Sequence, residues 1–549
     1  MTKSKRYGVI LIFLIIFHVV NNYIWLKNDC ESIHGCCDVV HHTNRAVLIY
    51  QGLREIFSSG SSCKEKFLRI WNLLLFDKKE YSRWPTLVPF TSASVSLLFK
   101  DTLLGIRFSN ILYFVIIIIA CYFVGSNLHS KEAGLFSACV VSLYPAIFGS
   151  SRKFGLDFPL VAIVVLSLYF LLKSEAFKNP LYSTITGVCF GIGMLIKFQF
   201  FIFFMGPLIY VLYQVFRDKT LKFKKVLWFT FILFLGSLIS LIWWHKIFLP
   251  EGREDIILRL LSPVRIIFHY KYYIFIEAFK LSIEGMFLNL SPIFFLMFLV
   301  GIFFYLRNMN RNKLFLLLWI VIPYICFTFV LLWGMGGVSR RPEFRHLFPI
   351  YPAIALVSVV GWLESPIKSN RLKILLLLIF LLAGVCQFFI LSYSTELPFV
   401  DSRYAHPPEK NNHLMVMEKF NHLIQQYKTS GRNIGIIETS FFNNDECVRL
   451  SYFLKLLDAK NNIFLSAEGV LPTRISDEFL YNVDIYDFLI AFSTSSKPDF
   501  SALMIYSQKS QKKLVEKAIE KFKKFKILKQ DVLLPEKVNI FLLERNDIS

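Results

Sequence analysis

The chain has 549 residues, of which 55% are hydrophobic and 17% aromatic, with a formal net charge of +22 and a mean hydropathy of +0.51. These values exceed what the core of a water-soluble protein requires, so they exclude a purely soluble domain and predict a polytopic membrane protein. Lys3, Lys5 and Arg6 precede an apolar segment at 7–26, which is long enough to cross a bilayer at roughly 20 residues per span. No small-residue cleavage site follows, so we expect a retained first membrane helix.

Further apolar segments predict membrane helices, for about eleven spans in all. They lie near 105–125, 134–149, 156–172, 183–198, 200–216, 226–245, 286–306, 314–333, 346–362 and 372–392. Lysines and arginines in alternate short loops place those loops on the side of the N-terminus, which is expected to be cytoplasmic. We therefore expect a multi-pass protein of the cell membrane, specifically the bacterial inner membrane, with an extracytoplasmic C-terminal end.

The remaining residues change character, because long apolar runs give way to alternating apolar and polar residues. This pattern predicts a small α/β domain, with strands near 433–438, 486–492 and 538–543 and helices near 447–457 and 512–525. We divide the chain into a multi-spanning domain at 1–392 and an extracytoplasmic domain at 393–549. The Lys-rich stretch at 511–529 is interpreted as a solvated helix face, so no nucleic-acid partner is expected.

Four of the ten cysteines fall in the first outward loop, namely Cys30, Cys36, Cys37 and Cys63. In an oxidising compartment they could form disulfides, for example between Cys63 and one of the adjacent pair. Zinc binding with nearby histidines is an alternative, but the spacing fits no standard zinc module. We rank a structural bridge or a free thiol above a metal site.

Charged residues flank the outward ends of the apolar segments. Two are acids: Asp38 lies in the first loop, and Asp157 lies at the start of the segment 156–172. Several cations are expected on the same face: Arg152, Lys153, Lys197, Arg340, Arg341 and Arg345. Carboxylates together with phosphate-binding cations are the groups needed for attack on a phosphate-linked donor, and an anionic ligand would explain why the outward loops are basic.

Three of these candidates have structural alternatives. Asp157 precedes an apolar run, where Asp commonly caps a helix. Lys197 lies between two apolar segments, so it could extend its amine to the membrane interface instead of contacting a lipid phosphate. His42 could orient Asp38 or contact an acceptor, but it could also be an ordinary surface residue.

These pieces resemble the lipid-linked sugar transferases of the GT-C fold, specifically glycosyltransferase family 39, the protein O-mannosyltransferase and aminoarabinose transferase group. The segments that resemble the family are Cys37 to His42, Ser151 to Leu160, Gly187 to Lys197, and Arg345 to Pro352. The resemblance covers residues 1–392 and depends on order and topology more than on any one motif. It departs from the family pattern at Val39, where many members have glutamate, and at 83–86, where a pair of prolines is usual.

The resemblance implies a GT-C-like fold and an inverting transfer of a hexosyl or pentosyl sugar from a polyprenyl-phosphate donor to an acceptor hydroxyl. The acceptor would be a lipid, a glycan or a protein. Asp38 would be the catalytic base. The expected binding residues are Asp157, His42, Arg152, Lys153, Lys197, Arg340, Arg345 and His346. No cofactor is required by this comparison, and a divalent metal ion is left open.

Other classes of function stay open at this level. A transporter would use charges within the membrane to line a substrate path, but the apolar segments show no internal repeat and the charges gather on one face. A non-catalytic membrane scaffold and an enzyme that uses diphosphate-linked donors are further alternatives.

Overall fold

The computed structural model describes residues 3–29, 37–74, 85–99, 102–217, 222–244, 272–307, 309, 311–334 and 344–408, together with five strands between 434 and 545. The chain divides into two compact units, and each is described by itself. One unit is Met1–Lys27 with Ile49–Pro408, and the other is Asn28–Leu48 with Glu409–Ser549. The assignment of separate domains at 1–392 and 393–549 stays a prediction.

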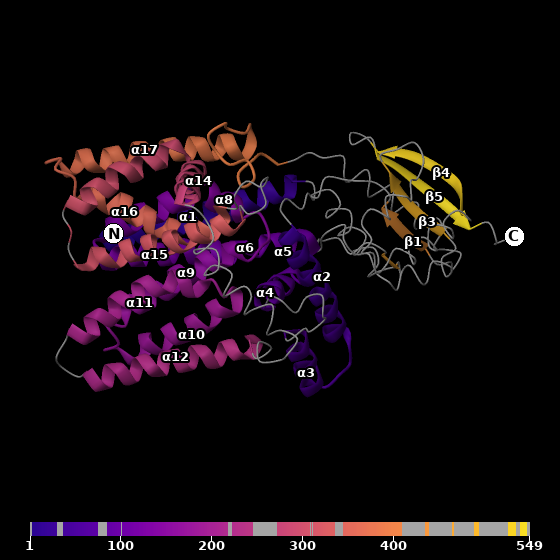
Figure 1. Ribbon diagram of the computed structural model, residues 1–549, viewed down its shortest axis with the longest axis horizontal. Helices are drawn as coiled ribbons and strands as arrows, with labels where there is room; N and C mark the ends of the chain where they lie inside the picture. The colour runs from indigo at the N-terminus through magenta and orange to yellow at the C-terminus, as the bar shows by residue number, and fades with distance from the viewer. Residues whose placement is uncertain are drawn as a thin grey trace. The chain divides into compact units, whose positions relative to one another are not determined.

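The described residues up to 408 form helices and the turns between them (Figure 1). Its helices are α1 (Lys3–Asn28), α2 (Cys37–Ser58), α3 (Cys63–Leu74), α4 (Leu87–Ser96), α5 (Thr102–Phe108), α6 (Asn110–Leu128), α7 (Lys131–Ser142), α8 (Pro145–Ser150), α9 (Asp157–Lys173), α10 (Pro180–Ile196), α11 (Phe200–Arg217), α12 (Lys222–Trp244), α14 (Tyr272–Arg307), α15 (Arg311–Gly334), the 3₁₀ helix η3 (Phe344–Ile350), α16 (Tyr351–Leu363) and α17 (Asn370–Tyr393).

Six helical segments in the described residues are long and apolar enough to cross a bilayer, which supports a multi-pass membrane protein. They are Arg6–Asn28, Thr102–Leu128, Phe200–Arg217, Phe279–Arg307, Phe344–Leu363 and Asn370–Tyr393. Four apolar helices are shorter: Leu87–Ser96, Pro180–Ile196, Leu227–Leu241 and Lys313–Thr328. The expected count of about eleven spans and the expected orientation stay predictions.

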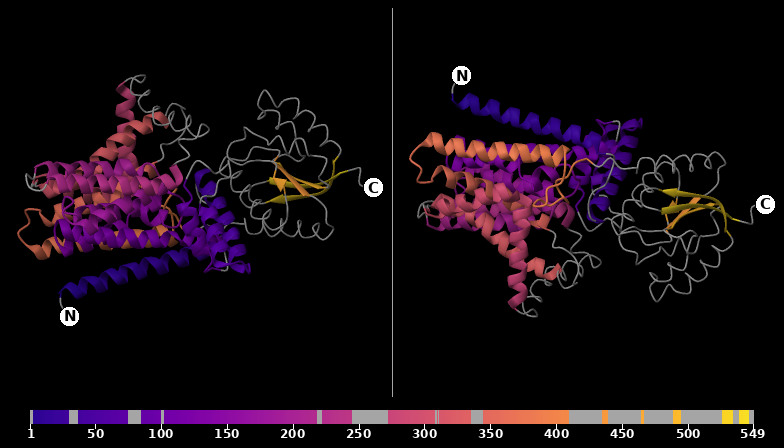
Figure 2. Two further views of the ribbon diagram at one scale, coloured as in Figure 1. Left: turned by 90° about the horizontal axis from the view of Figure 1, so that it is seen from below. Right: turned by 90° about the horizontal axis from the view of Figure 1, so that it is seen from above.

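The first and last long helices lie side by side: ring and hydroxyl contacts join α1 to α17, and the right-hand view of Figure 2 shows the indigo and orange helices next to each other. The Phe17 and Phe388 rings are 5.4 Å apart between centroids. About one helical turn further along the pair, the Tyr393 hydroxyl lies 3.0 Å from Asn21 Oδ1. Apolar packing and a polar contact therefore join segments from opposite ends of the helical part.

Prolines bend or divide two of the apolar segments. The expected span near 134–149 is divided into α7 and α8, because Pro145 follows Tyr144, whose φ of −64° and ψ of 126° are extended. A residue before proline avoids helical backbone, since the proline ring would clash with it. In α14, Ser291 precedes Pro292 and has a φ of 72° and a ψ of 159°, so the helix kinks there.

Glycines set the closest approach between helices. A Cβ at Gly361 of α16 would lie 1.8 Å from the Gly301 carbonyl oxygen of α14, and a Cβ at Gly301 would lie 2.6 Å from Ser358 backbone atoms. Similarly, a Cβ at Gly125 of α6 would lie 2.7 Å from Gly134 of α7. Such small residues allow backbones to pack directly, and this close packing favours helix association in lipid.

The described part beyond residue 408 is a five-stranded sheet. Its strands are β1 (Ile434–Glu438), β2 (Phe464–Leu465), β3 (Phe488–Ser493), β4 (Phe525–Leu533) and β5 (Val538–Arg545). The order is β2-β1-β3-β5-β4, with β1 parallel to β2 and β3, and β5 antiparallel to β3 and β4. Strands β1, β3 and β5 overlap the expected ones. The expected helix at 447–457 lies outside the described residues, as do 512–524 of the other expected helix, whose last residue, Phe525, begins β4. The Lys-rich stretch at 511–529, interpreted as a helix face, therefore ends in a strand, and the α/β assignment stays a prediction.

We expect Gly361→Ala to destabilise the protein, because the added methyl group collides with the Gly301 backbone and must push α14 and α16 apart. Overpacking of this kind costs roughly 1–3 kcal/mol. The measurement is thermal unfolding of the purified protein in detergent. Gly8→Ala is the matched control, since a Cβ at this helical glycine would meet nothing within 4 Å. Equal unfolding temperatures for the two variants would contradict the packing role of Gly361.

Candidate functional site

Three basic side chains converge on the carboxylate of Asp157. Lys197 Nζ donates a hydrogen bond to Asp157 Oδ1 at 2.6 Å. Arg345 Nε lies 3.5 Å from Oδ2, and His346 Nδ1 lies 3.7 Å from Oδ1. Asp157 is 9% exposed and Lys197 is 5% exposed, so the central ion pair is buried. The structure therefore brings together four of the residues that the sequence nominated.

These four residues lie at the ends of three helices. Asp157 is the first residue of α9, Lys197 directly follows the last residue of α10, and Arg345 and His346 are in the first turn of η3, which leads into α16. Since α9 and α10 run in opposite directions, the start of α9 and the end of α10 meet on one side of the helical unit. The cluster is thus a feature of one end of these helices, not of a path through them.

The capping alternative for Asp157 is wrong. The N-cap position of α9 is Leu156, and no side-chain capping hydrogen bond is made there. Asp157 occupies the first helical position, where the helix dipole favours a negative charge. Its carboxylate is directed to the cations and is not used to satisfy the helix end.

The glycines of α10 explain why Lys197 reaches this position. Gly187 and Gly191 pack against α12, where a Cβ would lie 3.0 Å from the Ile232 carbonyl oxygen or 2.6 Å from Ile239. Gly193 faces the Phe200 ring at the start of α11, and a Cβ at Gly193 would lie 2.3 Å from that ring. The chain can therefore reverse tightly after α10.

Lys197 stands at this reversal, and its backbone N–H donates to the Gly193 carbonyl. Lys197 does not extend its amine to the membrane interface, since the amine is buried against Asp157.

Aromatic packing holds η3 in place. Phe344, Leu347 and Phe348 are buried, and Phe344 lies against Gly285 of α14, where a Cβ would be 2.2 Å from the ring. The His346 ring stacks on Phe327 at 6.0 Å between centroids and 16° between planes. With its buried neighbours fixed, η3 presents Arg345 and His346 to Asp157.

The electrostatics of the cluster suit an anion. Counting Lys197 and Arg345 as +1 each, Asp157 as −1 and His346 as neutral, the four side chains carry a formal charge of +1. Burial weakens the screening of this charge by water. A divalent cation does not fit beside Asp157, whose near neighbours are already cationic. Elsewhere in the part of the chain that the structure describes, no group of three or more His, Cys, Asp or Glu side chains forms a metal-ligand set.

Arg152 is buried between helices. Its Nε donates to Asn22 Oδ1 at 3.1 Å, and its Nη2 donates to Ser392 Oγ at 2.9 Å. The guanidinium carbon lies 5.0 Å from the Trp25 ring centroid and 5.2 Å from that of Phe148. Arg152 thus links α1, α8 and α17 immediately before the turn that leads to Asp157. Its expected contact with donor phosphate stays a prediction.

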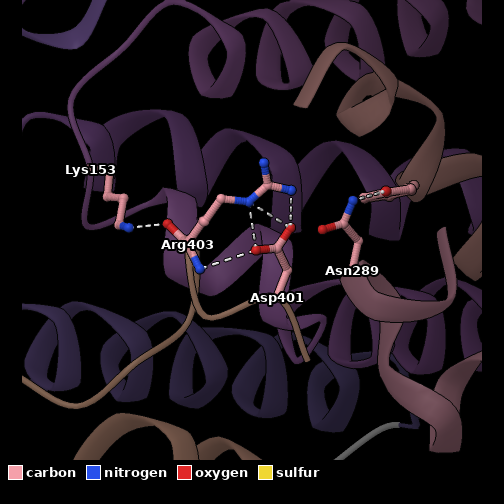
Figure 3. A network of polar contacts seen from close by, with 5 residues as sticks. Lys153, Asn289, Asp401 and Arg403 are labelled. Carbon is pink, nitrogen blue, oxygen red and sulfur yellow. Dashed lines mark hydrogen bonds and ion pairs between the residues drawn. The ribbon is translucent and has the colours of Figure 1, made fainter. Parts of the chain in front are cut away.

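Lys153 is tied to residues 394–408, which we call the strap. Figure 3 shows its amine directed to the Arg403 carbonyl oxygen, to which it donates. The Arg403 side chain folds over Asp401, with Nη2 2.6 Å from Oδ2 and Nε 2.9 Å from Oδ1. Beyond them, Asn289 Nδ2 donates to the Tyr351 hydroxyl at 2.8 Å. The sequence pattern places residues 394–408 in the expected C-terminal domain, and no periodicity or motif in them indicates these contacts.

The remaining nominated residues lie elsewhere or outside the described part. Asp38 is the second residue of α2 and His42 lies four residues later, so one helical turn separates them on the same face. His42 is buried, and the side chain of Asp38 lies outside the described residues, as do Arg340 and Arg341.

Of the first-loop cysteines, Cys63 has a free, exposed thiol at the start of α3, so the suggested bridge from Cys63 is not formed. Cys30, Cys36 and the side chain of Cys37 lie outside the described residues.

The buried ion pair gives a double-substitution prediction. Lys197→Met leaves the Asp157 carboxylate without its nearest cation and is expected to cost about 3 kcal/mol of unfolding free energy. Adding Asp157→Asn removes the uncompensated charge, so the double variant should be more stable than Lys197→Met alone. Thermal unfolding in detergent measures both. Additive losses from the two substitutions would contradict a coupled pair.

Comparison with known proteins supports the fold. Residues 84–244, from just before α4 to the end of α12, match the family described as dolichyl-phosphate-mannose-protein mannosyltransferase. Both Asp157 and Lys197 fall within the matched region. A search of curated protein sequences gives no match.

Three solved structures are similar over most of their length. ArnT from Cupriavidus metallidurans in the apo state has a TM-score of 0.56 at 12% identity, covering 100% of this chain and 99% of that chain. ArnT bound to undecaprenyl phosphate has a TM-score of 0.53 at 12% identity, covering 97% of each chain. The archaeal oligosaccharyltransferase AglB from Archaeoglobus fulgidus, in complex with an inhibitory peptide and a dolichol-phosphate, has a TM-score of 0.54 at 13% identity, covering 100% of this chain and 75% of that chain.

Identities this low establish the fold, and the resemblance expected from the sequence is confirmed at that level. The chain has the GT-C fold of lipid-linked sugar transferases, and residues 84–244 match the mannosyltransferase family model.

Proposed function

We propose that this protein is a membrane glycosyltransferase that moves a sugar from a polyprenyl-phosphate donor to an acceptor hydroxyl on the extracytoplasmic face. The observation that supports this most directly is the Asp157 cluster, in which Lys197, Arg345 and His346 meet at one end of apolar helices. A polyprenyl donor keeps its tail in the bilayer and its phosphate at the surface. A buried cationic cluster at the end of membrane helices is suited to that headgroup.

The similar structures agree with a lipid-phosphate ligand. ArnT was solved with undecaprenyl phosphate, and AglB was solved with a dolichol-phosphate. The two ligands share a long prenyl chain and a single phosphate, and the proposed donor of this chain shares both. The sugar, a hexosyl or pentosyl group, and the acceptor, a lipid, glycan or protein, are matters for experiment.

In the proposed reaction, Asp38 takes the proton of the acceptor hydroxyl while the hydroxyl oxygen attacks the anomeric carbon of the donor sugar. The bond between the anomeric carbon and the phosphate oxygen breaks, and its electron pair leaves with the polyprenyl phosphate. Attack from the side opposite the leaving group inverts the configuration. The products are the glycosylated acceptor, polyprenyl phosphate and a proton held by Asp38.

Lys197 and Arg345 would stabilise the charge that grows on the phosphate, so no general acid is needed for this leaving group. His346 would contact the same phosphate, and Arg340, Arg152 and Lys153 are further proposed donor contacts. Tight cation binding keeps a carboxylate ionised and makes it a weak base. We therefore assign Asp157 to holding the cations in place and not to proton removal.

Asp38 is the better candidate for the base because it belongs to a different part of the chain from the cation cluster. It lies in the first turn of α2, and His42 follows on the same helix face one turn later. In this proposal His42 orients the Asp38 carboxylate or contacts the acceptor.

The first test is binding of undecaprenyl phosphate to the purified protein. Arg345→Gln keeps a polar side chain but shortens it and removes the positive charge, and should weaken binding about tenfold or more, since a charge-assisted hydrogen bond contributes roughly 1.5–3 kcal/mol. Arg217→Gln at the opposite end of α11 is the control and should bind as the unmodified protein does. Equal affinities for Arg345→Gln and the control would exclude the proposed phosphate site.

The second test is the proposed base. Mass spectrometry of envelope lipids and glycans from cells that lack the protein identifies the species that it forms. Complementation with Asp38→Asn should fail to restore this species, because general-base catalysis contributes about a hundredfold to ten-thousandfold in rate. Glu65→Gln is the matched control, since the exposed Glu65 side chain accepts a hydrogen bond from the Ser62 backbone N–H at the start of α3.

Full restoration by Asp38→Asn would refute the base assignment. If deletion changed no glycosylated species but altered the distribution of a solute or lipid across the membrane, a transporter would be favoured. If deletion changed neither, a scaffold would be favoured.

A further inference from the structure

The strap is fixed to the helical unit at several points around the Asp157 cluster. The Asp401 backbone N–H donates to the Leu288 carbonyl of α14 at 3.3 Å. Arg403 accepts from Lys153 and is itself paired with Asp401. A Cβ at Gly149 of α8 would lie 2.1 Å from the Tyr404 carbonyl oxygen, so the backbones of α8 and the strap touch there. The strap therefore holds Tyr404 in a defined position.

The Tyr404 ring lies beside the helix that supplies Arg345. It makes an edge contact with Phe348, with 4.9 Å between ring centroids. In a 3₁₀ helix, residues three apart lie on the same face. Phe348 is three residues after Arg345 within η3, so Tyr404 packs on the face from which Arg345 extends to Asp157.

The electrostatic environment of the Tyr404 hydroxyl agrees with this position. Burial raises the pKa of the hydroxyl most, the charges of Arg403 and Arg345 lower that pKa, and those of Asp401 and Asp157 raise it. The hydroxyl therefore senses both charged partners at the core of the cluster and stays protonated at neutral pH. Within the described part of the chain, it makes no hydrogen bond with another residue.

We propose that Tyr404 is a donor-binding residue, whose hydroxyl donates a hydrogen bond to an oxygen of the lipid phosphate held by Lys197 and Arg345. This inference rests on the proposed function and adds a residue from outside the membrane helices. A phenol suits the task, because it brings a hydrogen-bond donor without adding charge and loses little conformational freedom when its ring is packed. The strap would then determine how far the Tyr404 hydroxyl extends toward the phosphate.

The test uses the full-length protein and undecaprenyl phosphate as the probe. Tyr404→Phe removes the hydroxyl and keeps the ring that packs on Phe348, and should weaken binding about fivefold to tenfold. Gly149→Ala keeps the hydroxyl but displaces the strap, so it should also weaken binding. Tyr393→Phe is the matched control, because its hydroxyl bonds to Asn21 on α1, and it should leave the affinity unchanged.

Unfolding temperatures are measured alongside, so that a loss of structure is not mistaken for a loss of contact. Unchanged affinity for Tyr404→Phe, with weakened binding for Arg345→Gln, would overturn the role of Tyr404 and leave the proposed function in place. Unchanged affinity for both would overturn the phosphate site itself. If Tyr404→Phe and Tyr393→Phe weakened binding equally, the inference would also be overturned, because loss of the Tyr404 hydroxyl would then have no specific effect on phosphate binding.

Discussion

The buried carboxylate of Asp157 is the contact on which the arrangement of the site depends. It pairs with Lys197 at 2.6 Å and with Arg345 at 3.5 Å. Removing charged groups from water is costly, so each buried charge is tolerated only while its partner of opposite charge is present. The ends of α9 and α10 and the start of η3 are therefore constrained to meet. Any ligand that enters this region meets cations already held in place.

The same constraint explains why the surrounding structure is built from glycine and aromatic residues. Gly193 lets Phe200 follow closely behind Lys197, and Gly285 receives Phe344 beside Arg345. These contacts leave little freedom in the backbone on either side of the ion pair. Rigid support of this kind keeps charged side chains oriented before a ligand binds, which reduces the cost of rearrangement on binding.

Two further polar networks border the site and have different tasks. Arg152 joins α1, α8 and α17 through Asn22, Ser392 and nearby aromatic rings. Arg403 and Asp401 hold the strap against the same unit. The cations that the sequence nominated therefore differ in their contacts: Arg152 bonds to neighbouring helices, whereas Lys197 and Arg345 pair with the Asp157 carboxylate. Residue type alone cannot separate these tasks, because both use the same guanidinium and ammonium chemistry.

The sequence by itself determined the class of the protein and the place of its main helices. The apolar segments expected at 156–172 and 372–392 correspond to α9 and α17, because local hydrophobicity decides which segments can leave water. It also nominated Asp157, Lys197 and Arg345, since charges beside apolar runs are conspicuous, and the resemblance to the family added His346.

Only the tertiary structure decided that these side chains meet, that α7 and α8 are separate, and that the strap lies with the helical unit. Contacts between residues 40 or more positions apart depend on how helices pack, and neither periodicity nor composition encodes that packing.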